Sequence, residues 1–453
     1  MEKTVEVAVI GAGLTGLTTA FYLKKKNKDF ILLEEKDIPG GVIQTRHENG
    51  FTYEEGPNTG VVGNPEVPEL FEDLNGLCKC EIASEKVNKR YILKEGVWEP
   101  MPMGPIQAVN TPLFTLKDKF RLLGEPFRSS GTNPNEPLSE MVKRRMGQSF
   151  LDYAIDPFIL GVYSGDPSRL ITKYAFPKLY NLEQNYGSFI GGSIKKMFEK
   201  KDEREKKATR KVFSVEGGLS ELISALCKSA GEDSLLLNIK NIEVNPAGDY
   251  FIITAMQNNE KVTITTKKII TTTGSYTLRP MLPFADNELL NAVEKLKYAR
   301  VIQVILGFKQ WKGMELDGFG GLIPFIEKRE ILGVLFLSAL LSYRAPEGGA
   351  LCSVFLGGVR REDLTDKTDD EVKIIVEREF SDVMRLKEFN PDLFKIIRYR
   401  YAIPQYGIES YEKLQALEQL QSTYKGLIIG GNLRDGIGMA DRIKQGKHLA
   451  DII

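Results

Sequence analysis

Histidine and cysteine, from which metal sites and many nucleophilic sites are built, are scarce in this chain. The 453 residues include two histidines and four cysteines. No two cysteines form a CxxC pair, and two histidines add too few ligands for a zinc or iron–sulfur site. No metal is therefore expected, and a reduced intracellular setting fits. Neither histidine lies in a serine or cysteine nucleophile pattern, so hydrolysis by a catalytic triad is not supported.

Net charge and long apolar runs are also missing. Lysine plus arginine number 61, as do aspartate plus glutamate, so no excess of positive charge points to nucleic acid. No stretch reaches the roughly 18 consecutive apolar residues that span a bilayer. The longest apolar run, residues 334–341, predicts a short buried strand, and residues 1–4 lead into another strand without a signal peptide. We expect a cytoplasmic chain, for which peripheral contact with the inner face of the cell membrane stays open.

The N-terminal segment carries a dinucleotide-binding fingerprint in its required context. Residues 5–10 predict a buried strand, residues 17–26 a helix and residues 30–33 a second strand that ends at Glu34. Between the first strand and the helix stands the sequence GAGLTG. A strand, a GxGxxG turn, a helix, a strand and an acid in this order indicate a Rossmann-type unit.

Each part of the fingerprint has a physical role in binding. Gly11 permits the tight turn, Gly13 lets the pyrophosphate approach the backbone, and Gly16 allows close packing of helix on strand. The phosphates would lie at the helix N-terminus, where free N–H groups and the helix dipole favour anions. Glu34 can accept hydrogen bonds from the ribose hydroxyls.

Two further glycine-rich segments indicate which dinucleotide is bound. Gly40 and Gly41 follow the ribose acid and precede residues 51–58, which contain the sequence EEGPN. Near the C-terminus, residues 426–429 predict a strand that enters GGN, followed by DGIGM and a helix from Ala440. Both patterns resemble the flavin-dependent amine oxidase superfamily, which includes phytoene desaturases and protoporphyrinogen oxidases. The resemblance implies FAD, and without a second strand–GxGxxG–helix unit no NAD(P)H site is expected.

The fingerprint and the resemblance together predict a set of cofactor-binding residues. In the superfamily, the glycine pair after the ribose acid approaches the flavin, and the C-terminal segment places backbone amides against the pyrophosphate and the isoalloxazine ring. The predicted residues are Gly11, Gly13, Leu14, Thr15, Gly16, Glu34, Glu35, Gly40, Gly41, Gln44, Thr45, Gly56, Pro57, Gly431, Asn432, Gly438 and Met439.

Short motifs in the middle of the chain narrow the resemblance to the protoporphyrinogen oxidase branch. The sequence PFILGVYSGDP at residues 157–167, followed by AFP at residues 175–177, is the most specific of them. FSVEGGL at residues 213–219, GFGGLIP at residues 318–324 and RAP at residues 344–346 match further pieces. The matches keep their order from residue 7 to residue 450, so the resemblance covers essentially the whole chain.

The resemblance also implies residues that contact a porphyrinogen. In this branch the macrocycle lies in an apolar slot beside the flavin, clamped by the leucine of the GFGxLxP piece, here Leu322, and by the residue before RAP, here about Leu341. Asn58, from the GPN piece, is implied to lie beside the flavin and to polarise the substrate. Both leucines could equally be core residues, and Asn58 a turn residue after Pro57.

The chain departs from the branch where a substrate propionate is bound. Several members carry an arginine after a W/L-x-P-x-P stretch, but residues 98–107 here contain none. Arg90, Arg121 or Lys117 could replace it, since a carboxylate prefers a guanidinium fork. The sequence does not choose among them.

These features predict an FAD- and oxygen-dependent oxidoreductase that converts protoporphyrinogen IX to protoporphyrin IX in haem biosynthesis. A bridging methylene would lose hydride to the flavin while a pyrrole nitrogen loses a proton, in three rounds, and the protein would position the ring. Three alternatives stay open: oxidation of coproporphyrinogen III to coproporphyrin III, another amine-oxidase-like FAD oxidase, and a non-catalytic porphyrin-binding protein. A ferrochelatase-type downstream enzyme is a candidate partner.

The expected fold is α/β, with a Rossmann-type FAD-binding domain, a mixed-sheet substrate domain and a helical insertion. The FAD-binding domain is expected in three parts, at residues 1–84, 211–274 and 421–453. Residues 275–420 would form the substrate domain, and residues 85–210 the helical insertion that covers the site and could face a membrane.

Within the insertion, residues 117–123, 138–146 and 149–162 predict helices, the last interrupted by Pro157. The mixed-charge run at residues 195–211 favours a solvated loop or helix over a membrane-facing basic patch.

Overall fold

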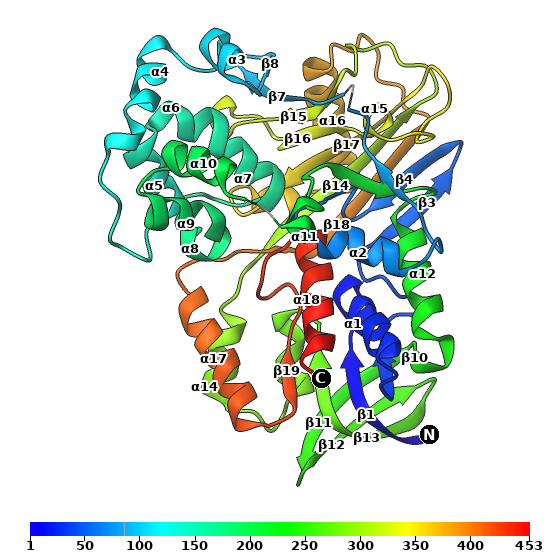
Figure 1. Ribbon diagram of the computed structural model, residues 1–453. Helices are drawn as coiled ribbons and strands as arrows, with labels where there is room; N and C mark the ends of the chain where they lie inside the picture. Colours follow the sequence, from blue (N-terminus) through cyan, green and yellow to red (C-terminus); the bar gives the residue numbers. More distant parts are fainter. Residues whose placement is uncertain (86, 201) are drawn as a thin grey trace.

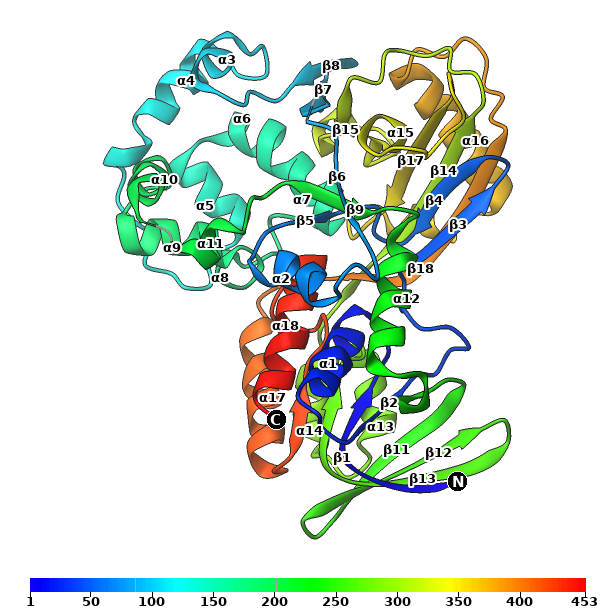
Figure 2. The same cartoon turned by 45° about the vertical axis from the view of Figure 1, so that its right-hand side comes forward.

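The framework of the molecule consists of two seven-stranded sheets. The computed structural model describes residues 1–85, 87–200 and 202–453. Figure 1 shows the first sheet in the lower half and the second in the upper half, with a group of helices beside the second. Figure 2 shows the same division from another side. The predicted α/β class with a mixed second sheet is confirmed.

The first sheet is assembled from the beginning, the middle and the end of the chain. Its order is β10-β2-β1-β13-β12-β11, and β19 pairs with β13. The strands are β1 (Glu2–Ile10), β2 (Phe30–Leu33), β10 (Leu235–Leu236), β11 (Ile239–Ala247), β12 (Tyr250–Gln257), β13 (Glu260–Thr271) and β19 (Leu427–Ile429). β1, β2, β10, β13 and β19 run parallel, and their short apolar sequences suit a sheet covered on both faces.

Helices cover both faces of this sheet. On one face lie α1 (Leu14–Lys25), α12 (Leu219–Ala230) and α18 (Met439–Asp451), with α2 (Glu66–Asp73) beside α18. On the other lie α13 (Leu278–Met281), α14 (Asn287–Glu294) and α17 (Ser410–Thr423). The predicted N-terminal strand, helix and second strand are confirmed, although the helix begins at Leu14 and so includes the last residues of the fingerprint.

The second sheet is mixed and has the order β18-β14-β17-β16-β15-β7-β8. Its strands are β7 (Lys89–Lys94), β8 (Val97–Pro100), β14 (Tyr298–Phe308), β15 (Gly318–Leu322), β16 (Gly333–Phe336), β17 (Ala350–Gly357) and β18 (Leu393–Pro404). α16 (Asp369–Val383) packs on one face. The hairpin of β3 (Gln44–Glu48) and β4 (Phe51–Glu55) packs on the other, with α15 (Leu337–Leu340). A smaller sheet of β5 (Gly60–Val61), β9 (Val212–Val215) and β6 (Cys80–Ile82) completes the strands.

Two segments of the second sheet differ from the sequence expectation. Residues 334–341 are not one strand, because β16 ends at Phe336 and α15 follows. Leu337 and Leu340 are both buried at helical spacing, and a short apolar run alone cannot distinguish strand from helix. The segment expected as helical insertion begins with β7 and β8, since β7 pairs in parallel with β15.

The helical region follows β8. Its helices are α3 (Pro105–Asn110), α4 (Leu116–Leu123), α5 (Leu138–Arg145), α6 (Gln148–Phe150), α7 (Asp156–Tyr163), α8 (Thr172–Ala175), α9 (Pro177–Tyr186), α10 (Phe189–Phe198) and α11 (Glu203–Lys206). The fully buried Arg145 joins them, because its guanidinium binds Glu125 at 2.6 Å and Glu183 at 2.9 Å. Pro157 does not break the expected helix: it lies in the first turn of α7, where its missing N–H is not needed, after a π-helical turn at Leu151–Ile155.

Two cations of the mixed-charge run pair with acids of α2. Arg204 binds Glu66 and Glu69, and Lys207 binds Glu72. Residue 201 of this run lies outside the described residues. The described part therefore agrees with a solvated, ion-paired helix. No helix in the described ranges is long and apolar enough to cross a membrane.

Candidate active site

The site begins where three parallel strands end side by side. The register aligns Ile10 with Thr271 and Thr271 with Ile429, so β1, β13 and β19 end at one edge of the sheet. Thr272 follows β13, and its Oγ1 donates to the carbonyl oxygen of Gly11 at 2.9 Å. The carboxyl edge of a parallel sheet is where such folds bind ligands. The fold thereby brings the GxGxxG turn beside the C-terminal glycine segment.

The predicted glycines of the first segment lie against one another. A Cβ on Gly16 would lie 1.8 Å from the carbonyl oxygen of Gly11, so only glycine allows this turn. A Cβ on Gly13 would meet nothing within 4 Å, and Gly41 approaches the Cα of Gly13. The amide of Gly40 donates to the carbonyl of Ala12 at 2.8 Å. Gly13 is also the N-cap of α1 and has no side-chain cap, which leaves space and N–H groups for an anion.

Glu34 is buried beside this turn, whereas Glu35 is exposed. The Glu34 carboxylate accepts a hydrogen bond from the amide of Ala12 at 2.7 Å and one from the amide of Lys36 at 3.0 Å. A carboxylate has about four acceptor positions. Glu34 therefore keeps acceptor capacity for ribose hydroxyls while it stabilises the turn.

Gln44 and Thr45 make contacts within the protein. The Gln44 amide group donates to the carbonyl of Pro39 at 3.1 Å. Thr45 exchanges two hydrogen bonds with Ser220 at the start of α12, at 2.7 and 2.9 Å. Both residues therefore hold the loop that follows the glycine pair.

A buried ion pair supports the next predicted segment. Glu54 binds Arg344 at 3.0 Å, and their side chains are 2% and 3% exposed. Glu54 also accepts from the hydroxyl of Thr45 and the amide of Leu219. Burial raises the pKa of Glu54, opposed by the hydrogen bond from Thr45 and the charge of Arg344. The arginine of the RAP motif is thus occupied inside the protein.

Gly56, Pro57 and Asn58 follow this pair, and Gly56 is hydrogen-bonded to the second sheet. The amide of Gly56 donates to Oε1 of Gln303 at 3.2 Å, and the Gln303 side chain donates to the carbonyl of Glu54 at 3.1 Å. The sequence reasoning missed Gln303, although it is the only polar side chain in residues 301–308 and could have been noticed for that reason.

Asn58 carries a polar atom without a partner. Its side chain is 5% exposed, and within the described residues its buried Oδ1 accepts no hydrogen bond. Leaving such an acceptor unpaired costs about 1–3 kcal/mol. A bound group with an N–H or O–H donor would remove this cost, so the residues present fit a cofactor or substrate that carries one.

The C-terminal predicted residues complete this edge. The amide of Gly431 donates to Gln445 at 2.8 Å, and a Cβ on Gly431 would lie 2.8 Å from the carbonyl of Thr273. Gly438 is the N-cap of α18, and Met439 is its buried first residue. The structure therefore collects the predicted glycines from both ends of the chain around one edge.

The two predicted substrate leucines have different surroundings. Leu322 ends β15 and is partly exposed, and it contacts α7 so closely that a Cβ on Gly161 would lie 2.3 Å from its Cδ2. Leu341 follows α15 and is 4% exposed. Leu322 thus has a free face, while Leu341 is a core residue in this structure.

The GVYSGDP motif explains why α7 reaches Leu322. The Tyr163 hydroxyl donates to the carbonyl of Ala175 in the AFP piece at 2.8 Å. Arg360 binds Asp156 at 2.6 Å and Asp166 at 3.1 Å. The GVYSGDP motif, the most specific one in the sequence, therefore holds the helical region against the second sheet.

Arg90 is the candidate propionate partner that lies on a strand paired with that of Leu322. It is exposed on β7, paired with β15, and its guanidinium lies 5.6 Å from the centre of the Phe319 ring. Arg121 donates to the carbonyl of Lys143 on α5, and Lys117 is exposed on α4.

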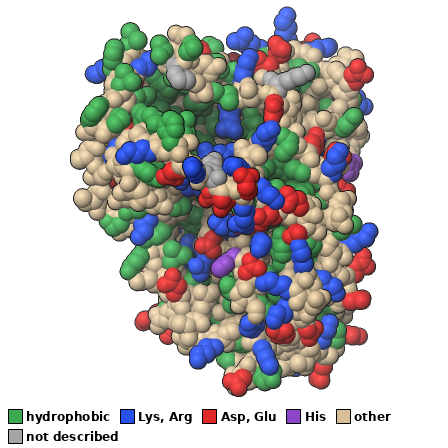
Figure 3. All heavy atoms as spheres, in the orientation of Figure 1, with side chains coloured by type: hydrophobic (Ala, Val, Ile, Leu, Met, Phe, Trp, Pro, Cys, Tyr) green, Lys and Arg blue, Asp and Glu red, His purple; other side chains and the backbone are tan. Residues whose placement is uncertain are grey.

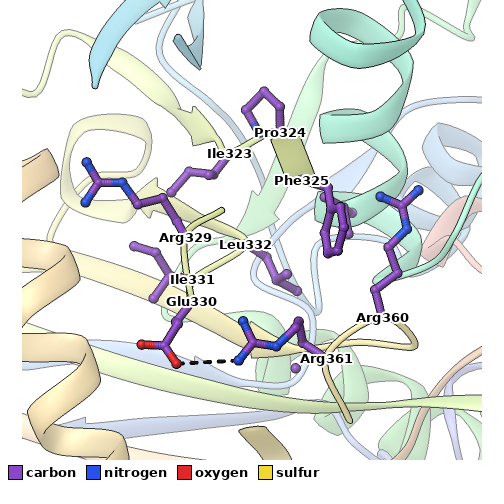
Figure 4. Close-up of a pocket in the computed structure, with 11 residues that line it drawn as sticks. Ile323, Pro324, Phe325, Arg329, Glu330, Ile331, Leu332, Arg360 and Arg361 are labelled. Carbon is purple, nitrogen blue, oxygen red and sulfur yellow. Dashed lines mark hydrogen bonds and ion pairs between the residues drawn. The ribbon is translucent and has the colours of Figure 1, made fainter. Parts of the chain in front are cut away.

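The cavities near the helical region are separate from this site. The pocket in Figure 4 has a volume of about 10 Å³, which is the space of a single water. A larger hollow of about 640 Å³ lies between α5, α6 and Phe325 and is lined by polar and charged side chains. None of the predicted site residues lines either one. The glycine segments, with their close backbone approaches, are the better guide to a flavin site.

Comparison with known sequences places the chain among flavin enzymes. The family model for flavin containing amine oxidoreductase matches residues 14–453. Protoporphyrinogen oxidase 2, chloroplastic/mitochondrial, of Arabidopsis thaliana is 30% identical, covering 99% of this chain and 93% of that protein. Coproporphyrinogen III oxidase of Bacillus subtilis (strain 168) is 26% identical, covering 97% of this chain and 96% of that protein.

Solved structures agree on the fold. A crystal structure of a provisionally named protoporphyrinogen oxidase from Exiguobacterium sp. 255-15 superposes with a TM-score of 0.82 at 21% identity, covering 99% of this chain and 98% of that one. Reduced UDP-galactopyranose mutase gives a TM-score of 0.73 at 17% identity, covering 99% and 93%. At these identities the likeness concerns the fold alone.

The ion pair beneath the site predicts a large stability difference between two neighbouring glutamates. Glu54→Gln leaves the Arg344 charge buried and unpaired, so we expect the free energy of unfolding to fall by about 3 kcal/mol or more. Glu55→Gln, which loses only a half-exposed pair with Arg46, should cost about 1 kcal/mol or less. Urea unfolding measures both, and equal losses would show that the buried pair has no special role.

Proposed function

We propose that this chain, which belongs to the family of flavin-containing amine oxidoreductases, is an FAD-dependent oxidase of a porphyrinogen. The observation that carries the proposal is the full-length match to proteins named as porphyrinogen oxidases. The order of the GVYSGDP, GFGGLIP and RAP motifs supports it. Protoporphyrinogen IX is the proposed substrate, and molecular oxygen the proposed electron acceptor.

Coproporphyrinogen III is the second candidate substrate. The relatives named coproporphyrinogen III oxidase, from Bacillus subtilis (strain 168) and Staphylococcus aureus (strain NCTC 8325 / PS 47), are each 26% identical over nearly the whole chain. This substrate has four propionates rather than two, so it needs more cationic partners. Arg90 is the one candidate cation next to the strand of Leu322.

The residues of the chain have distinct roles in this proposal. Gly11 would permit the tight turn, and Gly13 would let the pyrophosphate approach the backbone. Gly41 would approach the flavin, and Glu34 would hold the ribose. Leu322 would contact the macrocycle with its exposed face. The bound flavin supplies a two-electron acceptor for the hydride of a bridging methylene, while the protein orients the ring and excludes competing reactions.

Asn58 would hold a pyrrole N–H. Its unpaired Oδ1 is an acceptor, and a hydrogen bond from the pyrrole would polarise the N–H whose proton leaves as the hydride departs. A strong base is not required if backbone carbonyls share the proton. The role of Asn58 is therefore to orient and polarise rather than to carry charge.

The activity is tested by anaerobic reduction of the purified yellow holoenzyme. We expect one of protoporphyrinogen IX and coproporphyrinogen III to bleach the flavin absorbance and to yield the fluorescent porphyrin after air is admitted. The substrate that reacts identifies the enzyme. A flavin that stays oxidised with both compounds would rule out the porphyrinogen proposal and leave another FAD oxidase.

The role of Asn58 predicts a loss of rate without a loss of flavin. Asn58→Leu should lower kcat by about 10- to 100-fold, the range that one to two lost hydrogen bonds produce, while the flavin stays bound. Asn135→Leu, an exposed loop position, is the control and should keep the wild-type rate. Full turnover in Asn58→Leu would show that this side chain is not needed.

We propose that the helical region docks on a membrane, into which a poorly soluble porphyrin product can leave. Large apolar side chains on and around α3 and α4 are 64% to 90% exposed: Met103, Ile106, Val109, Leu116, Phe120, Leu123 and Phe127. Figure 3 shows hydrophobic side chains gathered over the upper left of the molecule, where these helices lie in Figure 1. An exposed apolar patch of this extent marks an interaction surface.

Phe120→Ser with Phe127→Ser tests this docking. Burying a phenylalanine contributes about 1.5–3 kcal/mol, so the double variant should bind phosphatidylglycerol-containing vesicles at least tenfold more weakly in sedimentation. Ile374→Ser removes a 64% exposed apolar side chain from α16 and should leave binding unchanged. Equal binding by all three proteins, or no sedimentation of the wild type, would contradict docking through this face.

A further inference from the structure

The loop between β19 and α18 has an unusual arrangement of its carbonyl groups. Five successive carbonyl oxygens, those of residues 432–436, all accept hydrogen bonds from buried side chains. Lys413 donates to Leu433 (2.7 Å), and Arg442 donates to Arg434 (2.9 Å) and Asp435 (3.0 Å). The single hydroxyl hydrogen of Tyr406 is shared between Asn432 (2.7 Å) and Gly436 (3.1 Å).

The three donors come from separate elements and are deeply buried. Tyr406 follows β18 and is 3% exposed, Lys413 lies on α17 and is 1% exposed, and Arg442 lies on α18 and is 8% exposed. The Lys413 ammonium also lies 4.6 Å from the centre of the Tyr406 ring. Three buried side chains therefore hold the carbonyls of this loop.

Most backbone N–H groups of the same loop, in contrast to its carbonyls, have no hydrogen-bond partner among the described residues. Within the described residues no acceptor is recorded for five of its N–H groups, those of Asn432, Leu433, Asp435, Gly436 and Ile437. Backbone amides are rarely left without a partner unless water or a ligand binds them. Successive free N–H groups also make a surface that attracts negative charge.

Burying these cations is costly and calls for a reason. The pKa of Lys413 is lowered to about 8, mainly by burial and also by the charge of Arg434, although Glu409 and Asp435 oppose the shift. Burial also lowers the pKa of Arg442, whose Nε has no partner among the described residues. An apolar residue at either position would avoid this cost. Their hydrogen bonds to the loop carbonyls explain why both buried cations are present.

We propose that Tyr406, Lys413 and Arg442 are positioning residues that fix the carbonyls of residues 432–436 and so present the amides of this loop to the flavin. The inference rests on the flavin site of the proposed function and deepens it. Because free amides favour negative charge, a well-held loop stabilises the reduced flavin, which is more anionic than the oxidised form. A loosened loop would lower the reduction potential and weaken binding of the cofactor.

Two variants of the holoenzyme test the proposal. Tyr406→Phe removes one oxygen and its shared hydrogen bond to two loop carbonyls, and Lys413→Met removes the ammonium at nearly constant volume. Tyr424→Phe is the matched control, because its hydroxyl donates to the carbonyl of Phe284 at 3.2 Å, outside the loop. Flavin release on heating is followed by flavin fluorescence, unfolding by circular dichroism, and the midpoint potential by dye equilibration.

For both variants we expect FAD to dissociate about tenfold more readily and to leave before the protein unfolds. The midpoint potential should fall by up to about 30 mV, the two-electron equivalent of tenfold. Lys413→Met should unfold at the wild-type temperature or above it, since a buried charge has been removed. Tyr424→Phe should keep the wild-type potential and affinity.

A merely structural role gives a different result. The temperatures of flavin release and of unfolding would then fall together, while the midpoint potential and the affinity for FAD stay unchanged. This outcome would overturn the proposal. If Lys413→Met does not fold, Tyr406→Phe decides alone, because it removes a single atom. No porphyrinogen is used, so failure here leaves the proposed oxidation intact, and failure of the porphyrinogen assay leaves this result intact.

Discussion

Parallel pairing of β1, β13 and β19 is the constraint on which the site depends. Because the three strands end in register, the turn after Ile10 and the loop after Ile429 lie at one edge although they stand at opposite ends of the chain. Thr272 follows the middle strand. Its hydroxyl donates to the carbonyl of Gly11 in the first turn, and its own carbonyl oxygen lies against Gly431 in the second. A shift in this register would separate the two glycine segments, and with them the two halves of the cofactor site.

Buried charged groups hold the second sheet, the helical region and the segment before Asn58 in place. Glu54 and Arg344 hold the segment before Asn58, Arg145 joins the helical region with Glu125 and Glu183, and Arg360 binds α7 to the second sheet. Buried pairs contribute little net stability but are costly to break. They therefore serve to hold each region in one arrangement. This matters for the proposed oxidase, which must place a large macrocycle against a cofactor.

Much of the fold and part of the site could be predicted from the sequence. The strand, glycine turn, helix and acid at residues 5–34 were found because their pattern depends on neighbouring residues alone. Membership of the flavin family followed from motifs spread along the chain. The run at residues 334–341 was mistaken for one strand because a short apolar segment has no periodicity that separates strand from helix. The individual roles of the predicted site residues and the domain boundaries stay predictions.

The sequence by itself determined the FAD fingerprint and the family, because these depend on local pattern and on motif order. Only the tertiary structure decided that Arg344 is buried against Glu54, that Leu341 is a core residue, and that the oxygen of Asn58 has no partner among the described residues. It also decided that Tyr406, Lys413 and Arg442 meet at one loop. Such facts depend on contacts between residues far apart in the chain, and no local pattern encodes which distant side chain a buried polar group will meet.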